Sequence, residues 1–187
     1  MEMMAQLPSR ISRIVLVGFM GAGKSTVGAL LAQHLRWQFL DADRVLEERV
    51  GASIAEIFAK DGEAAFRSLE SQVIRDLLSR SCLVLALGGG AVETQTVREA
   101  LLNTQETCVI FLEAPLEVMI ARCEHQPGAD VRPVLNDRGQ LRRRFDSRLP
   151  HYRNAHLVIK TESLTAEETS LHIFNAVNSL LKENAPA

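Results

Sequence analysis

Residues 18–26 read GFMGAGKST, which fits the phosphate-binding pattern G-x-x-x-x-G-K-[ST]. They follow the apolar run 14–17, which predicts a buried strand, and residues 24–35 predict the helix after it. Backbone N–H groups of such a turn and helix N-terminus converge on a polyphosphate. Lys24 is expected to neutralise the β- and γ-phosphates, and the Ser25 hydroxyl to bind Mg²⁺. A chance glycine-rich turn is the alternative, but pattern and context agree, so the chain is predicted to bind a nucleoside triphosphate.

Two carboxylates, Asp41 and Asp43, lie at the end of the second predicted strand, residues 38–41. Alternation along an extended chain points both to the same side, and open parallel sheets bind ligands at the carboxyl ends of their strands. One carboxylate could hold Mg²⁺, directly or through water, and the other could accept a proton from an attacking hydroxyl. The alternative is that Asp43 only caps a helix beginning at Arg44. The neighbouring phosphate-binding motif favours the functional interpretation.

Arg67 and Glu70 are three positions apart on one face of a predicted helix. Glu70 could orient the guanidinium so that Arg67 grips an anion with two N–H groups. A surface ion pair of little energetic consequence fits the spacing equally well. The spacing therefore leaves both interpretations open.

Three consecutive glycines, Gly88, Gly89 and Gly90, follow the third predicted strand, residues 83–87. Consecutive glycines are costly in backbone entropy. They are reasonable where a ligand approaches the backbone so closely that no side chain fits. A turn requiring positive φ is the alternative, but it would rarely need three glycines.

Arginines are concentrated in one stretch near the C-terminal end of the chain. They are Arg138, Arg142, Arg143, Arg144, Arg148 and Arg153. A nucleic-acid-binding patch is disfavoured because few aromatic residues interleave with them and the net charge is -2. Most are expected on a solvated helix face, and one or two could bind phosphate or carboxylate near the site.

Apolar runs and amphipathic stretches alternate along the chain. The predicted strands are 14–17, 38–41, 83–87, 109–112 and 157–159, and the predicted helices are 24–35, 53–60, 63–79, 94–103, 115–123, 141–152 and 165–182. The strands read as continuous apolar runs, which is typical of strands covered on both faces. This order predicts an α/β fold with a five-stranded parallel sheet flanked by helices. Residues 125–133, with two prolines and a glycine, predict a loop that is either a lid or a plain surface connection.

Length and composition favour one domain. The 187 residues suffice for a substantial core, and 47% hydrophobic and 24% charged residues are ordinary for a globular protein. The net charge of -2 argues against a protein that coats nucleic acid or an anionic membrane. The first 13 residues lack the apolar core of a signal peptide, and no run is long enough to span a bilayer. A cytoplasmic location is therefore expected.

In order and spacing these motifs resemble the shikimate kinase family. The resemblance covers about residues 14–161 and rests on linked segments: GFMGAGKST at 18–26, FLDAD at 39–43, IF at 57–58, GE at 62–63, FR at 66–67 with Glu70, ALGGGAV at 86–92, RP at 132–133 and RLPHY at 148–152. It implies a three-layer P-loop kinase fold with a mobile lid. It also implies ATP-dependent phosphorylation of the 3-hydroxyl of shikimate, with Mg²⁺ as cofactor.

The resemblance implies roles for individual residues. The ATP-binding set is Gly21, Ala22, Gly23, Lys24, Ser25, Thr26, Arg122 and Arg132, and Mg²⁺ is held by Ser25 with help from Asp41. The shikimate-binding set is Asp43, Arg67, Glu70, Gly88, Gly89, Gly90 and Arg148. Lys24, Asp43 and Arg132 are the catalytic residues. Asp43 acts as the base or as an orienting group at the 3-hydroxyl, and Arg132 closes over the phosphates on the lid.

The resemblance also implies an organisation for the whole chain. Residues 1–187 form a single kinase domain, with a lid at approximately 124–136 and a substrate-binding helical region at approximately 44–79. ATP and shikimate are the expected partners, with no nucleic acid and no membrane, and a monomer is expected. Another small-molecule kinase of this fold, such as a gluconate or nucleoside monophosphate kinase, is the alternative enzyme. A nucleotide-binding regulatory protein without catalysis is the alternative from another class.

Overall fold

A parallel β-sheet is the centre of the computed structural model, which describes residues 10–124 and 137–183. Its strands are β1 (Arg13–Val17), β2 (Gln38–Asp41), β3 (Leu83–Ala86), β4 (Thr107–Glu113) and β5 (Leu157–Lys160). They lie in the order β2-β3-β1-β4-β5, and every pairing is parallel. The predicted five-stranded parallel sheet is confirmed.

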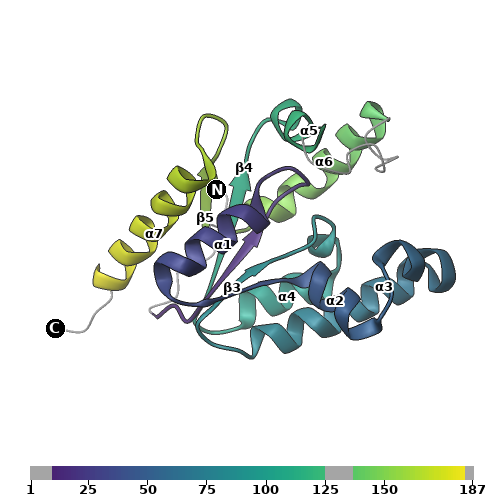
Figure 1. Cartoon of the computed structure of the whole chain (residues 1–187), viewed down its shortest axis with the longest axis horizontal. Helices are drawn as coiled ribbons and strands as arrows, with labels where there is room; N and C mark the ends of the chain where they lie inside the picture. Colours follow the sequence, from purple (N-terminus) through teal and green to yellow (C-terminus); the bar gives the residue numbers. More distant parts are fainter. Residues whose placement is uncertain (1–9, 125–136, 184–187) are drawn as a thin grey trace.

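Helices cover both faces of the sheet and give the three-layer architecture. They are α1 (Lys24–Leu35), α2 (Ala42–Val50), α3 (Ile54–Leu78), the 3₁₀-helix η1 (Ala91–Glu93), α4 (Gln95–Asn103), α5 (Leu116–Glu124), α6 (Arg138–Arg153) and α7 (Ala166–Glu183). α1 and α7 pack side by side on one face, whereas α4 packs with α3 on the other (Figure 1). No helix in the described residues is long and apolar enough to cross a bilayer.

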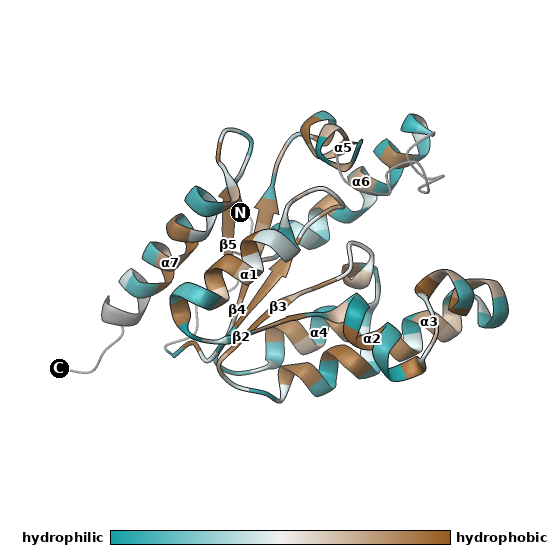
Figure 2. Ribbon diagram, viewed as in Figure 1, coloured by the Kyte–Doolittle hydropathy of each residue, from teal (hydrophilic) through white to brown (hydrophobic). Residues whose placement is uncertain are grey.

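The hydrophobic core forms where the central strands meet these helices. Every residue of β3 is buried, as are Ile14 and Leu16 on the neighbouring strand β1 and Val109 on β4. Figure 2 shows hydrophobic residues along the strands and on the sides of the helices that face them. The prediction that all strands are covered on both faces is wrong for β5, where half-buried and exposed residues alternate. β5 lies at the edge of the sheet, and its exposed residues, Val158 and Lys160, share one face.

The sequence after β2 forms a helix that the apolar pattern did not predict as a separate element. α2 begins at Ala42, and the Asp41 side chain is its N-cap, accepting from the N–H of Asp43 at 3.1 Å. The idea that Asp43 caps a helix beginning at Arg44 is therefore wrong. Because Asp41 caps the helix, Asp43 lies in its first turn.

The helices predicted at 53–60 and 63–79 are confirmed as the two segments of α3. They meet at Gly62, whose φ of 79° and ψ of 176° are not helical. The left-handed φ favours glycine at this junction. The first segment begins with a capping box between Ser53 and Glu56, which fixes where the helix starts. α2 and the start of α3 extend beyond the carboxyl edge of the sheet (Figure 1).

Tyr152 fastens α6 to the loop after β3. Its ring is fully buried and stacks on Phe111 of β4, with centroids 5.2 Å apart. Its hydroxyl donates to the carbonyl of Gly89. Burial raises the pKa of this phenol, so it stays a hydrogen-bond donor at neutral pH. The triple glycine is thereby held against the core.

Tyr152→Phe is expected to lower the free energy of unfolding by about 1–2 kcal/mol, because it removes the hydroxyl that pairs the Gly89 carbonyl and keeps the stacked ring. Urea denaturation measures the difference. Ser147→Ala is the matched control, since it removes an exposed hydroxyl that bonds only to its own helix. Equal stability of Tyr152→Phe and the original protein would contradict this anchoring role.

Candidate functional site

Two adjoining cavities open at the carboxyl edge of the sheet. The first, of about 420 Å³, is lined by the phosphate-binding loop at residues 18–26, the P-loop, together with Asp41. The second, of about 440 Å³, is lined by α3 residues with Glu93. Asp43, the backbone of 88–90 and Arg148 line both cavities. The geometry is that of a site with two compartments that meet at these shared residues.

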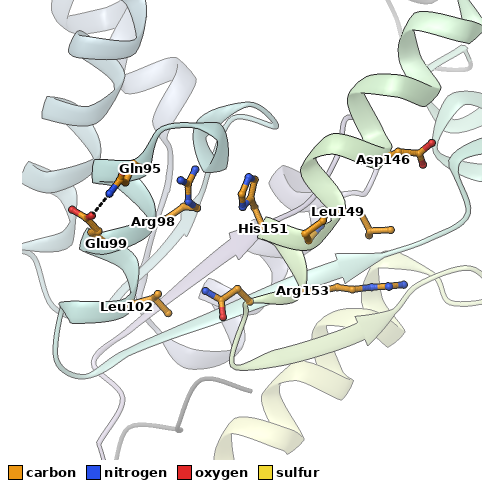
Figure 3. Close-up of a pocket in the computed structure, with 10 residues that line it drawn as sticks. Gln95, Arg98, Glu99, Leu102, Asp146, Leu149, His151 and Arg153 are labelled. Atoms are coloured by element: carbon orange, nitrogen blue, oxygen red, sulfur yellow. Dashed lines mark hydrogen bonds between the residues drawn. The ribbon is translucent and has the colours of Figure 1, made fainter. Parts of the chain in front are cut away.

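A larger pocket of about 760 Å³ lies elsewhere, between α4 and the C-terminal half of α6 (Figure 3). It contains none of the predicted site residues. Arg98 and His151 face each other across it. Volume alone therefore does not identify the chemical site in this molecule.

The P-loop presents an open helix N-terminus to the first cavity. Gly23 is the N-cap of α1 with a φ of 90°, and no side chain caps the helix there. Gly21 has a φ of 72°, and a Cβ at this position would collide with the carbonyl of Met119. Both glycines are thus required by backbone geometry, and the uncapped N–H groups suit an anion.

Lys24 lies folded back on the loop that precedes it. Its Nζ donates to the carbonyls of Gly18 at 2.8 Å and Phe19 at 3.0 Å. Desolvation lowers the pKa of Lys24 to about 8, and Asp43 and Asp41 oppose that shift. The ammonium thus faces two carboxylates in the first cavity, where phosphate oxygens could replace its carbonyl partners.

Ser25 and Asp41 bring two hard oxygen ligands together. The Ser25 hydroxyl donates to Oδ2 of Asp41 at 2.7 Å, while Oδ1 of Asp41 caps α2. Magnesium prefers such ligands, usually one or two from the protein with water and phosphate completing the octahedron. The donor set therefore fits Mg²⁺.

Asp43 is the residue where the two compartments meet. Burial, and then repulsion from Asp41, raises its pKa to about 6, while Lys24 acts in the opposite direction. A Cβ on Gly88 would lie 2.6 Å from Oδ1 of Asp43. The missing side chain at Gly88 is therefore what lets this carboxylate reach the shared wall.

Arg67 is held by several carboxylates inside the second cavity. Its Nη1 donates to Oε2 of Glu70 at 2.8 Å, and Glu63 pairs with Nη2 at 3.3 Å. Only 3% of the Glu70 side chain and 19% of the Arg67 side chain are exposed. The surface-pair alternative is therefore wrong, because a buried acid fixes this guanidinium.

The triple glycine also accommodates Arg67. A Cβ on Gly90 would lie 2.6 Å from Nη2 of that residue. None of the three glycines has a positive φ, so the turn alternative is wrong. The sequence suggested that a ligand approaches the backbone of these glycines closely. In the structure, the side chains of Asp43 and Arg67 make that close approach.

Arg148 reaches the shared wall from α6. Its side chain is 12% exposed, and its guanidinium lies over the Phe19 ring with Cζ 5.8 Å from the centroid. Its Nε is buried without a hydrogen-bond partner among the described residues. Packing against Phe19 and the nearby Tyr152 hydroxyl orient this arginine toward both cavities.

Glu93 joins the two arginines, and the sequence did not single it out. Its Oε2 accepts from Nη2 of Arg67 at 3.1 Å and from Nη2 of Arg148 at 2.9 Å. The second cavity also has an apolar part that the sequence did not predict, formed by Ile54, Phe58 and Phe66. An apolar helix face in the sequence does not reveal where a cavity interrupts it.

The remaining predicted residues differ in where they lie. Arg122 of α5 donates to the hydroxyl of Thr161 at 3.2 Å and to its carbonyl at 2.6 Å. Arg132 and nearly all of the lid predicted at 124–136 fall outside the described residues. Of the other arginines, Arg144 lines the second cavity. Three further arginines form solvent-exposed ion pairs with glutamates: Arg138, Arg142 and Arg153.

Asp43→Asn is expected to stabilise the metal-free, nucleotide-free protein at neutral pH. The pKa of Asp43 is about 6 in the folded state and 3.8 ordinarily, so folding retains a proton that the unfolded chain loses between these values. The free energy of unfolding therefore falls as pH rises through this window, by about 1–3 kcal/mol. The Asn variant lacks this fall.

Urea denaturation of both proteins at about pH 4.5 and about pH 7.5 measures the effect. The advantage of the Asn variant should be larger at the higher pH. Asp61→Asn, at an exposed position of α3, is the control for loss of one carboxylate. Parallel pH dependences for Asp43→Asn and the original protein would rule out the raised pKa.

The chain is similar to known shikimate kinases over most of its length. The model of the family described as shikimate kinase matches residues 20–178. Shikimate kinase from Acinetobacter baylyi is 42% identical over 170 residues, which are 90% of this chain and 93% of the relative. Its counterpart from Thermus thermophilus is 38% identical over 166 residues, 87% and 88% of the two chains.

Solved structures agree with this match. Shikimate kinase from Acinetobacter baumannii in complex with shikimate has a TM-score of 0.81 at 39% identity, covering 90% of this chain and 94% of that one. A gluconokinase from Sinorhizobium meliloti has a TM-score of 0.58 at 16% identity, with 93% and 96% covered, and shares the fold alone. Since the family model and the relatives cover most of its length, the chain belongs to the shikimate kinase family.

Proposed function

We propose that this chain transfers the γ-phosphoryl group of ATP to the 3-hydroxyl of shikimate, which gives ADP and shikimate 3-phosphate. The observation that carries the proposal is the pair of arginines, Arg67 and Arg148, set opposite the P-loop across Asp43. Shikimate is a carboxylic acid with ring hydroxyls, so it needs a cationic clamp at one end and an acceptor at the other. Both lie within one continuous site.

The first cavity binds the nucleotide in this proposal. Backbone N–H groups of 21–26 surround the β- and γ-phosphates, and Lys24 exchanges its loop carbonyls for phosphate oxygens. Ser25 and Asp41 hold Mg²⁺, which supplies charge neutralisation to the phosphates. Arg122, tied to Thr161, contacts the adenine, and Arg132 is assigned to the phosphates from the family resemblance.

The second cavity binds shikimate. Its carboxylate lies between Arg67 and Arg148, with Glu70 fixing the first of these. The ring rests on the backbone of 88–90 and faces the apolar wall that includes Phe58. A neutral sugar leaves both guanidinium groups without their anion, and this disfavours its binding.

Asp43 handles the hydroxyl at the junction of the cavities. Its carboxylate accepts a hydrogen bond from the 3-hydroxyl, turns the oxygen toward the γ-phosphate and receives or stabilises its proton. The pKa of this carboxyl is raised to about 6, which is nearer to neutral pH than its usual value and suits a general base. The ammonium group of Lys24 interacts favourably with the negative charge of Asp43 from the side of the first cavity.

The wider organisation follows the same proposal. The chain acts as a single domain over 1–187, as a monomer in the cytoplasm. A lid at approximately 124–136 excludes water from the γ-phosphate, and 44–79 binds the acceptor. The net charge of -2 supports small-molecule partners over nucleic acid or membrane.

A coupled assay of ADP release across shikimate, gluconate and nucleoside monophosphates tests the proposal. Shikimate is expected to stimulate ADP release strongly, and the others weakly or not at all. Phosphorylation of gluconate at a comparable kcat/KM would favour the alternative kinase. Absence of any acceptor-dependent release would favour a regulatory nucleotide-binding protein.

Arg67→Ala is expected to raise the KM for shikimate about 10- to 100-fold, because a charged hydrogen-bonding partner contributes about 1.5–3 kcal/mol. The KM for ATP should change less than about threefold, since Arg67 lines only the second cavity. Steady-state kinetics with each substrate varied in turn separates the two constants. Arg44→Ala, an exposed arginine on α2, is the matched control. Equal weakening of both substrates would contradict the clamp.

A further inference from the structure

Glu93 occupies the place between the two arginines of the clamp. It is the last residue of η1, the short helix that follows the triple glycine. Its Oε2 accepts hydrogen bonds from both Arg67 and Arg148. One carboxylate oxygen bridging two guanidinium groups is the arrangement that a bound carboxylic acid would adopt. We propose that Glu93 keeps the clamp occupied until the substrate carboxylate displaces it, an inference that rests on the proposed function of these arginines.

Exposure distinguishes Glu93 from the permanent partner of Arg67. The Glu70 side chain is 3% exposed, so moving it would leave a buried guanidinium unpaired. The Glu93 side chain is 37% exposed, and its carboxylate can rotate into water. Glu93 is therefore the exchangeable acid of the pair, and Glu70 remains to hold Arg67 when the exchange takes place.

The backbone of Glu93 is fixed independently of its side chain. Nη1 of Arg98 donates to the carbonyls of Val92 at 2.7 Å and Glu93 at 2.8 Å. The N–H of Glu93 donates to the carbonyl of Gly90 at 3.0 Å. Figure 3 shows Arg98 extending from α4 along the wall of the large pocket. Displacement of the carboxylate therefore needs only rotation of the Glu93 side chain.

An occupied clamp makes the second cavity selective for acids. A ligand with its own carboxylate replaces the pairs that Glu93 loses, whereas a neutral polyol cannot. The apparent affinity for the acid equals the intrinsic affinity multiplied by the fraction of molecules whose clamp is open, so ten-to-one occupancy by Glu93 weakens binding about tenfold. Glu93 thus favours carboxylic acids over neutral polyols, and it does so while lowering the affinity for the acid itself.

Glu93→Gln tests the proposal, because the amide keeps the size of the side chain and removes its charge. Calorimetric titration of shikimate into the nucleotide-free variant should give a Kd about 3- to 10-fold lower than in the original protein. The KM for shikimate should fall in parallel, with the KM for ATP unchanged. Glu93→Ala should act in the same direction. Glu99→Gln, which removes an exposed charge on α4, should leave the Kd as it was.

The opposite result has a clear meaning. A Kd that is unchanged or raised in both Glu93 variants would overturn the proposal, since Glu93 would then only support the arginines. Cyclohexene-1-carboxylate, which has the ring and the acid but no hydroxyl, is the second probe. Tighter binding of this probe to Glu93→Gln, without shikimate-dependent ADP release by the original protein, would support the occupied clamp and reject the proposed reaction.

Discussion

The close approach of side chains to the backbone of 88–90 is the constraint on which the site depends. Asp43 arrives from α2 and Arg67 from α3, and each lies where a Cβ of Gly88 or Gly90 would stand. A Cβ at either position would come within 2.6 Å of one of these side chains and displace it. The three glycines cost backbone entropy, and they allow an acid and a cation to line one wall of the site.

Buried charge in this site is tolerated because each group has an opposite charge beside it. Arg67 is desolvated, yet Glu70 and Glu93 keep its guanidinium charged. Asp43 is less well compensated, since Asp41 repels it while Lys24 attracts it, and its pKa rises as a result. The protein thus spends folding stability on a carboxylate poised for proton transfer, as is usual at functional sites.

The sequence predicted most of the fold because its signals are local. The P-loop pattern, the apolar strands and the glycines each lie within a few positions, so β1, α1 and β2 were found within one residue at each end. Contacts between distant positions carry no such signal. Glu93 is 26 positions from Arg67 and 55 from Arg148, and only folding brings these three residues together. Neither residue type nor spacing distinguishes Glu93 from any exposed acid.

Helix α6 connects one arginine of the clamp with the backbone of the triple glycine. Arg148 and Tyr152 are four positions apart on α6, so they project from the same face. The first reaches both cavities, and the second donates to the carbonyl of Gly89 between them. A shift of α6 therefore moves the clamp and the wall together and preserves their spacing.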